Sequence, residues 1–423
     1  MVFAAFLIIL LLLLASGIHI GVGLGLTAVG LLFFFQGIPL EVITQTAFKS
    51  VNSYALAAIP FFILSGDLIM GGKMGYRVVD LTGVFLRRIH GGLAVAVMIV
   101  SIFFGAVSGS SVASAAALGR NTVDLLSGEG YPKRFVAGLV AVGGTLGLMI
   151  PPSLTFILIG TMQGIPIITL FTAGIVPGVL EGTILAVVTW YLCRRNGWGN
   201  TSSIPVTVKE ITPKVKASLG ILLMPAVILG GIYGGFFTPT EVSAVAAAYA
   251  FIVVVLIYRV VRAREVIPIL YRSLMASGMI YFIVIGGNLT AFMLTRLGVT
   301  DSFVQLVTGV GMQPWQFLLM INLILLVLGM LLDGISVIIL TVPIFFPAAM
   351  ALGIDPIHLG VILTANVEIA TLTPPVGLNL FVMSGVSGLP VDQVARGVGP
   401  FYLVRLAVLM VITYVPALSL WLV

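Results

Sequence analysis

The chain has 423 residues, of which 60% are hydrophobic and only 8% are charged, with a net charge of +6. Because soluble domains carry about 25% charged residues, this composition predicts an all-α polytopic membrane protein embedded in the lipid bilayer. The basic residues lie in loops between apolar runs, which is typical of membrane orientation signals and gives no indication of nucleic acid. The single Cys193 excludes internal disulfides and cysteine metal clusters.

The chain begins with an apolar stretch, residues 2–35, that is long for one span and short for two. We expect two short spans, because residues 16–19 interrupt the stretch with Ser, Gly and His. The polar residues of 39–53 suit an interfacial amphipathic arm, and residues 55–72 are apolar enough to span the membrane.

Residues 93–119 carry a run of small residues at their centre and lie between two basic loops. A span here would put these loops on opposite faces, whereas a re-entrant hairpin keeps both on the cytoplasmic face, as the positive-inside rule favours. Residues 315–350, with Asp333 and Gly334 near their middle, are expected to form a second hairpin from the other side. With two hairpins, every basic loop lies inside and both termini lie outside.

Consecutive prolines interrupt two later apolar runs. Residues 135–163 contain the pair that begins at Pro151, and residues 358–390 contain the pair that begins at Pro374, at a sequence offset of 374 − 151 = 223. Proline cannot donate a backbone hydrogen bond, so carbonyls near each pair lose their helical partners. The hydrocarbon core of a bilayer contains no donor that could replace these hydrogen bonds. We therefore expect both breaks to face protein, water or a bound ion.

The two hairpins and the two breaks recur at an offset of about half the chain, and their loop charges give them opposite orientations. This pattern predicts an inverted repeat, which is a signature of secondary transporters. We divide the chain into a first repeat at 1–193, a cytoplasmic linker at 194–216 and a second repeat at 217–423, with a second interfacial arm at 264–275.

The hairpin tips and the breaks meet most economically at the membrane midplane, where broken helices offer carbonyl oxygens and N–H groups. A hard cation such as Na⁺ prefers several oxygen ligands. The sequence therefore predicts two oxygen cages. The first is made of Ser108, Ser110, Ser111, Gly144 and Thr145, and the second of Asp333, Gly334, Ser336, Thr371 and Thr373.

Each polar residue also has a plainer structural interpretation. A Ser or Thr in a membrane helix often bonds to a nearby backbone carbonyl, and Asp333 could cap a helix. Arg296 could extend to the outer interface or bind a carboxylate. Asp67 and Glu368 are open between ion pairing and function, and Glu241 is assigned to capping a helix start.

Several motifs resemble the large membrane subunit of tripartite ATP-independent periplasmic (TRAP) transporters, the DctM-like family. They are AIPFFILSGD from Ala58, SGSS from Ser108, GLMIPPS from Gly147, FFTPTE from Phe236 and TLTPPVGLNL from Thr371. The resemblance covers essentially the whole chain.

This resemblance implies an elevator fold, in which a mobile domain carrying both hairpins moves against a static scaffold. It also implies Na⁺-coupled import of a small organic acid across the bacterial inner membrane. A periplasmic substrate-binding protein would deliver the acid, and a small four-helix membrane subunit, expected as a separate chain, would brace the scaffold.

The same resemblance implies roles for individual residues. It places sodium near Ser108, Ser110, Gly144, Thr145, Met149 and Pro151, and near Gly334, Ser336, Thr371, Thr373 and Pro374. It makes Ser110, Ser111, Ser153, Arg296 and Asp333 the candidates for binding the substrate.

Three alternatives stay open: a stand-alone carboxylate carrier that needs no binding protein, a membrane-embedded enzyme and a channel. No nucleophile–base pair and no GxxxxGK[ST] loop is present, so we expect neither catalytic residues nor ATP as the driver. The transported acid is not specified by the sequence, because similar chains handle C4-dicarboxylates, sialic acids, keto acids and sulfonates.

Overall fold

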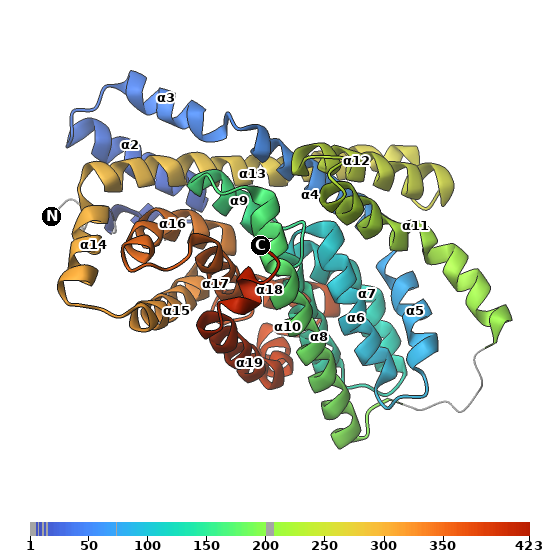
Figure 1. Cartoon of the computed structure of the whole chain (residues 1–423). Coiled ribbons are helices and arrows are strands. Elements are labelled where there is room, and N and C mark those ends of the chain that lie inside the picture. The colour runs from blue at the N-terminus through green and yellow to red at the C-terminus, as the bar shows by residue number, and fades with distance from the viewer. Residues whose placement is uncertain (1–5, 7, 11, 14–15, 73, 200–206) are drawn as a thin grey trace.

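The computed structural model describes residues 6, 8–10, 12–13, 16–72, 74–199 and 207–423, and its regular elements in these ranges are all helical (Figure 1). Within them, nine helical segments are long enough and apolar enough to cross a membrane. The chain is therefore a multi-pass membrane protein. Most of the first expected span lies outside the described residues.

The first half contains a series of helices that ends before the polar linker. They are α2 (Ile20–Phe34), α3 (Leu40–Val51), the 3₁₀ turn η1 (Tyr54–Ala57), α4 (Ala58–Gly71), α5 (Gly75–Leu86), α6 (Gly92–Ser108), α7 (Ser111–Gly128), α8 (Lys133–Met149), α9 (Leu154–Gln163) and α10 (Ile167–Asn196).

The second half repeats much of this order. Its elements are α11 (Val208–Tyr233), α12 (Pro239–Phe251), the π-helical turn η2 (Ile252–Ile257), α13 (Ala263–Arg296), α14 (Val299–Gly309), α15 (Pro314–Leu331), α16 (Gly334–Ala351), α17 (Pro356–Ala370), α18 (Leu378–Ser387), α19 (Val391–Tyr414) and α20 (Ala417–Leu420).

Helix starts in the two halves pair at a nearly constant sequence offset. The offset is 314 − 92 = 222 between the starts of α6 and α15, and 334 − 111 = 223 between those of α7 and α16. The same comparison gives 356 − 133 = 223 for α8 and α17, and 391 − 167 = 224 for α10 and α19. The internal repeat expected from the prolyl pairs thus extends through five consecutive helices of each half, including α9 and α18.

For description, we divide the helices into two groups. The frame helices are α2–α5 and α11–α14, and the site helices are α6–α10 and α15–α20. Within the frame, the long α13 packs against α2, α3 and α4, and it runs across the upper part of Figure 1. The site helices gather below it, where α8 packs against α6, α7 and α19.

Residues 264–275 differ from their expected form. They belong to the continuous 34-residue α13 and do not form a separate arm, whereas residues 39–53 do contain the separate helix α3. Most of α3 is exposed, with Ile43 its buried residue, as suits a helix that lies at a surface.

Glycines let α8 approach both helices of the first hairpin. A methyl group on Gly144 would lie 2.7 Å from Ala115 Cβ and 2.9 Å from Ser111 O on α7. A methyl group on Gly105 of α6 would lie 3.1 Å from the Cα atom of Gly147. Close backbone approach through small residues is the usual way in which membrane helices pack tightly.

Candidate functional site

Both hairpin tips and both helix breaks meet at one small cavity of about 90 Å³. It is lined by Gly109, Ser110, Ser111 and Val112 from the first tip, Leu148, Leu154 and Thr155 from the first break, Asp333, Gly334 and Ile335 from the second tip, and Val367, Thr371 and Leu378 around the second break. The site is therefore assembled symmetrically from the two halves of the chain.

The first break is closed by hydroxyl groups. The carbonyl of Leu148, which the prolines leave without a helical donor, accepts hydrogen bonds from Ser153 Oγ and from Thr155 Oγ1, the latter at 3.1 Å. Leu154 N donates to Gly109 O at 3.4 Å and so ties the break to the first tip. The most apolar window of the segment 133–163 is completely buried, so the break faces protein as expected.

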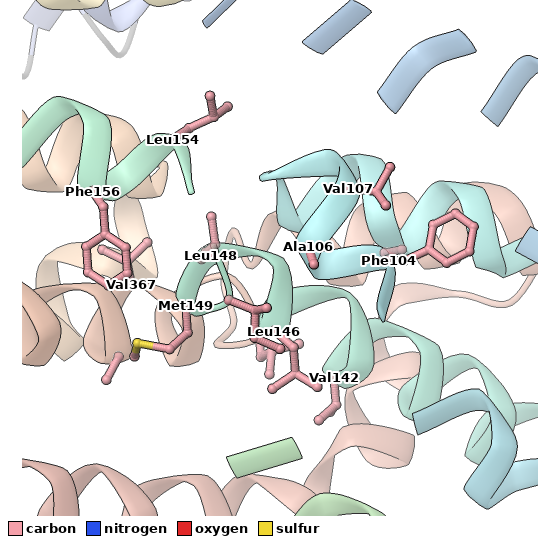
Figure 2. Packing of buried hydrophobic residues seen from close by; sticks show 14 of the residues in the cluster. Phe104, Ala106, Val107, Val142, Leu146, Leu148, Met149, Leu154, Phe156 and Val367 are labelled. Atoms are coloured by element: carbon pink, nitrogen blue, oxygen red, sulfur yellow. The ribbon is translucent and has the colours of Figure 1, made fainter. Parts of the chain in front are cut away.

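Gly109 is required at the first tip for two reasons. Its φ of 59° is left-handed, a conformation that glycine adopts without strain, and a methyl group there would lie 2.8 Å from Pro152 O. Figure 2 shows buried apolar side chains around the first break, with Leu148 and Met149 ending α8 and Leu154 beginning α9.

The second tip is organised by Asp333. Its carboxylate caps α16 by accepting hydrogen bonds from Ser336 N at 3.1 Å and from Ser336 Oγ. The second break is tied to its hairpin by Val376 N, which donates to Met330 O at 3.2 Å. The helix-capping interpretation of Asp333 is thus confirmed, and its carboxylate also lines the cavity.

Four helices begin at the cavity, because its lining includes first-turn residues of α7, α9, α16 and α18. Helix N-termini carry partial positive charge and unpaired N–H groups, so they attract anions. The C-terminal ends of α6, α8, α15 and α17 adjoin the same tips and breaks, and they present carbonyl oxygens. The cavity is therefore bordered by helix N-termini, which favour anions, and by helix C-terminal ends, which favour cations.

Five candidates from the sequence line the cavity: Ser110, Ser111, Asp333, Gly334 and Thr371. The others surround it or lie elsewhere. Arg296 is not brought to the cavity: it is exposed at the end of α13, with its guanidinium 5.2 Å from the ring centroid of Phe292. The interpretation in which Arg296 extends to the surface therefore fits the structure.

Several hydroxyl candidates, including Thr371 at the cavity, donate to nearby carbonyls. Thr145 bonds to Val142 O at 2.8 Å, Thr371 to Glu368 O at 2.8 Å, and Thr373 to Ile369 O at 2.7 Å. Ser108 approaches both Ser110 O and Ser114 Oγ, at 3.1 and 2.6 Å. A hydroxyl that donates one hydrogen bond keeps lone pairs for a cation, so these bonds are compatible with ligation.

Four other candidates have no side-chain oxygen. Gly144 permits the α7–α8 contact, and Met149 is buried with its carbonyl facing Gly174 of α10. Pro151 is buried and Pro374 is exposed, and both begin prolyl pairs joined by cis peptide bonds.

No group of three or more His, Cys, Asp or Glu side chains that could hold a metal ion occurs in the part of the chain that the structure describes. A cation here would rely on hydroxyl and carbonyl oxygens together with Asp333.

Sequence reasoning missed a buried ion cluster beneath the second break. Arg405 Nη2 donates to Glu368 Oε2 at 2.7 Å, and Arg405 Nη1 lies 3.0 Å from Glu181 Oε1. The side chains of Arg405 and Glu368 are fully buried, and that of Glu181 is 4% exposed. The cluster joins α10, α17 and α19.

The repeat itself contained a signal for this cluster. Glu181 and Arg405 differ in sequence number by 405 − 181 = 224, so they occupy equivalent positions of α10 and α19. Equivalent residues that touch each other lie at the axis relating the two halves. Thr155 and Asn379 form another equivalent pair, with 379 − 155 = 224, and Asn379 Nδ2 donates to Ala141 O at 3.0 Å across the two halves.

Comparison with protein families agrees with this architecture. The model described as "Tripartite ATP-independent periplasmic transporter, DctM component" matches residues 7–418. The chain belongs to this family.

This TRAP permease is similar to two curated relatives and to one solved structure. The chain is 40% identical over 398 residues to the C4-dicarboxylate TRAP transporter large permease protein DctM of Pseudomonas aeruginosa, covering 94% of this chain and 92% of that protein. It is 34% identical to the isethionate TRAP transporter permease protein DctMQ of Oleidesulfovibrio alaskensis, covering 99% of this chain and 65% of that one. The crystal structure of the YdaH transporter of Alcanivorax borkumensis has the same fold, with a TM-score of 0.61 at 13% identity over 90% of this chain and 88% of that one.

Membership in this family makes the chain a large permease subunit of a TRAP transporter, and it is a transporter rather than an enzyme. The family is tripartite, which implies partner subunits and a substrate-binding protein.

Proposed function

We propose that this permease takes up a small organic acid carrying a carboxylate, with coupling to sodium, at the cavity between the two hairpin tips. A periplasmic binding protein delivers the acid, and a small four-helix membrane subunit braces the frame helices. The complex lies in the bacterial inner membrane. The observation that carries the proposal is the convergence of four helix N-termini, several carbonyl ends and the Asp333 carboxylate on one cavity.

The charges of the cavity support an acid as substrate and a cation as its companion. The N-termini favour a carboxylate, whereas Asp333 disfavours one unless a cation neutralises it. Sodium bound by Asp333 and the surrounding oxygens would remove this repulsion, so each ion would improve the binding of the other. Such reciprocity is the physical basis of coupled transport.

The cavity of about 90 Å³ is smaller than the roughly 300–1,000 Å³ of ordinary ligand pockets. A four-carbon diacid therefore enters only after the two tips separate. We infer that the present conformation is a closed one and that the hairpins enter the membrane without crossing it, so that their tips can part.

The distribution of polar contacts supports an elevator motion of the site helices against the frame helices. Strong polar pairs lie within each group, such as Asp67 with Ser273 in the frame at 2.6 Å and Arg405 with Glu368 in the site group. Contacts across the boundary include the aromatic pair Phe303 and Phe317, with ring centroids 6.4 Å apart. Apolar contacts slide at lower cost than buried ion pairs break.

The test is uptake by proteoliposomes that contain the permease, its partner membrane subunit and the matching binding protein. Radiolabelled succinate, a sialic acid, a keto acid and isethionate are offered with and without an inward sodium gradient. Sodium-dependent accumulation of one acid supports the proposal. Accumulation that is equal with and without the sodium gradient contradicts the coupling to sodium. Uptake in the absence of the binding protein favours the stand-alone carrier.

A pair of matched variants tests the site itself. Asp333→Asn keeps a helix cap but removes the charge at the cavity, because Asn and Asp cap about equally well. We expect the sodium concentration for half-maximal uptake to rise at least about tenfold, since a unit charge at about 4 Å contributes about 4 kcal/mol at an effective dielectric constant of ~20. Asp355→Asn is the control, because Asp355 caps α17 away from the cavity. Equal effects of both variants would contradict the assignment.

A further inference from the structure

A second and larger cavity, of about 930 Å³, lies where the frame helices meet the first hairpin. Its walls come from the end of α4, the start of α5, α7 and the start of α13. Three guanidinium groups line it, from Arg77, Arg264 and Arg272, together with the amide of Asn121 and the carboxylate of Glu265. The lining has three cations and one anion, so an anionic ligand fits its charge.

Only some of the charged groups that line this cavity interact with other groups of the protein. Glu265 Oε2 accepts a hydrogen bond from Arg262 N at 2.7 Å and helps to begin α13. Arg77 is directed to the ring of Tyr258, at 5.4 Å from its centroid. Arg264 and Arg272 are exposed and form neither a hydrogen bond nor an ion pair with any residue in the described ranges, although the charge of Arg272 also acts on the buried carboxylate of Asp67.

The surface beside the cavity is apolar. Ile267, Tyr271 and Leu274 lie on the same stretch of α13 as Arg264 and Arg272 and are 71%, 65% and 64% exposed. Large apolar side chains exposed on a membrane protein face acyl chains, and adjacent arginines then lie at the level of the lipid headgroups. An anion held here can therefore carry hydrocarbon tails that continue along α13.

We propose that the cavity holds the phosphate of an anionic phospholipid, with Arg264 and Arg272 as the charged ligands and Asn121 as a neutral donor. A guanidinium pairs with phosphate through two parallel N–H···O bonds, and basic pockets between membrane helices bind anionic headgroups. The acyl chains lie against Ile267, Tyr271 and Leu274. The lipid is distinct from the transported acid, and the site shares no lining residue with the cavity between the hairpin tips.

The location gives the bound lipid a consequence for transport. Asn121 belongs to α7 of the site helices, whereas Arg264 and Arg272 belong to α13 of the frame. A phosphate bound to both bridges the two groups and stabilises the arrangement in which they are adjacent. Anionic lipid therefore shifts the population toward the conformation described here, by its difference in affinity for the two conformations.

The experiment measures lipid binding to the purified full-length chain by native mass spectrometry in detergent. The probes are dioleoyl phosphatidylglycerol, dioleoyl phosphatidylcholine, inorganic phosphate and succinate. Each surface arginine contributes about 1 kcal/mol to the binding of an anionic lipid, so Arg264→Gln with Arg272→Gln weakens phosphatidylglycerol binding by about 30-fold. Each single variant weakens it by about 5-fold.

The matched control is Arg88→Gln with Arg195→Gln, which changes the net charge equally but lies outside the cavity. Thermal unfolding of each variant verifies that it is folded. The proposal is supported when the cavity variants lose phosphatidylglycerol and the control variants retain it. It is overturned when the two pairs bind this lipid equally, or when phosphate or succinate alone occupies the arginine-dependent site and displaces the lipid.

Discussion

Removal of the Arg405 guanidinium is the sharpest test of how the site helices are held together. In the wild type, two carboxylates share one guanidinium at 3.0 and 2.7 Å, so the cluster of Glu181, Glu368 and Arg405 has a formal charge of −1 in a buried environment. Arg405→Gln changes this formal charge to −2, because it removes the guanidinium that pairs with both carboxylates. Removing one partner of a buried ion pair costs about 3–5 kcal/mol, and we expect a loss of that size in the free energy of unfolding.

The charge count predicts an unequal effect for the two kinds of substitution. Glu181→Gln leaves Arg405 and Glu368 as a neutral pair, with a charge of zero, so its cost is about 1 kcal/mol or less. Adding Glu181→Gln to Arg405→Gln returns the charge to −1 and recovers part of the loss. This is an interaction energy that a double-mutant cycle isolates.

The assay is reversible unfolding of the purified chain in mixed micelles of a mild detergent and increasing sodium dodecyl sulfate. Arg195→Gln, an exposed arginine on the same helix as Glu181, is the control and should change the unfolding free energy by less than ~0.5 kcal/mol. The reasoning is refuted if Glu181→Gln destabilises as much as Arg405→Gln. It is equally refuted if Arg405→Gln costs less than about 1 kcal/mol.

Two further predictions concern the first hairpin and break. Gly144→Ala puts a methyl group 2.7 Å from Ala115 Cβ, so α7 and α8 must separate. We expect the free energy of unfolding to fall by about 1–3 kcal/mol in the same assay. An unchanged free energy would show that the α7–α8 interface accommodates the methyl group. Thr155→Val removes one of the two hydroxyl donors to Leu148 O, at a cost of about 0.5–1.5 kcal/mol. Because Thr155 also lines the cavity, the sodium concentration for half-maximal uptake should rise in that variant, and an unchanged sodium dependence would show that the Thr155 hydroxyl does not contribute to cation binding.

Much of the fold could be predicted because its signals are local. A prolyl pair breaks a helix wherever it occurs, and both breaks lie where the sequence indicates, between α8 and α9 and between α17 and α18. The role of Glu241 at a helix start was likewise predicted from the sequence. In the structure Glu241 and Thr238 cap α12, and both reciprocal hydrogen bonds are present.

The second arm shows how a local difference changes an element. The first arm ends at Asn52, which has a non-helical ψ of 61°. The position equivalent to Asn52 in the second half is Ala276, at 52 + 224, and alanine is the best helix former. The helix therefore continues from residue 263 to Arg296.

The candidate site was predicted less completely, because most of its contacts join distant parts of the chain. The tips and breaks were expected to converge and do so. Thr155 was overlooked because an isolated threonine in an apolar run gives no signal, and the partners of Glu368 were overlooked because no local pattern joins residues 181, 368 and 405. Only the repeat offset of 224 would have paired Glu181 with Arg405.

The symmetry of the halves places equivalent residues together, but the chemistry at those positions differs. Ser110 caps α7 at the first tip, and Asp333, at the equivalent position with an offset of 333 − 110 = 223, caps α16 at the second. The two residues occupy equivalent positions, but only Asp333 is charged. The two proposed oxygen cages would therefore differ in cation affinity, because only the second includes a carboxylate. If sodium binds as proposed, the first cage would be the weaker one, and its occupancy would depend on the negative charge of the substrate. The divergence from Ser110 to Asp333 would thus make the binding of one sodium ion conditional on the acid.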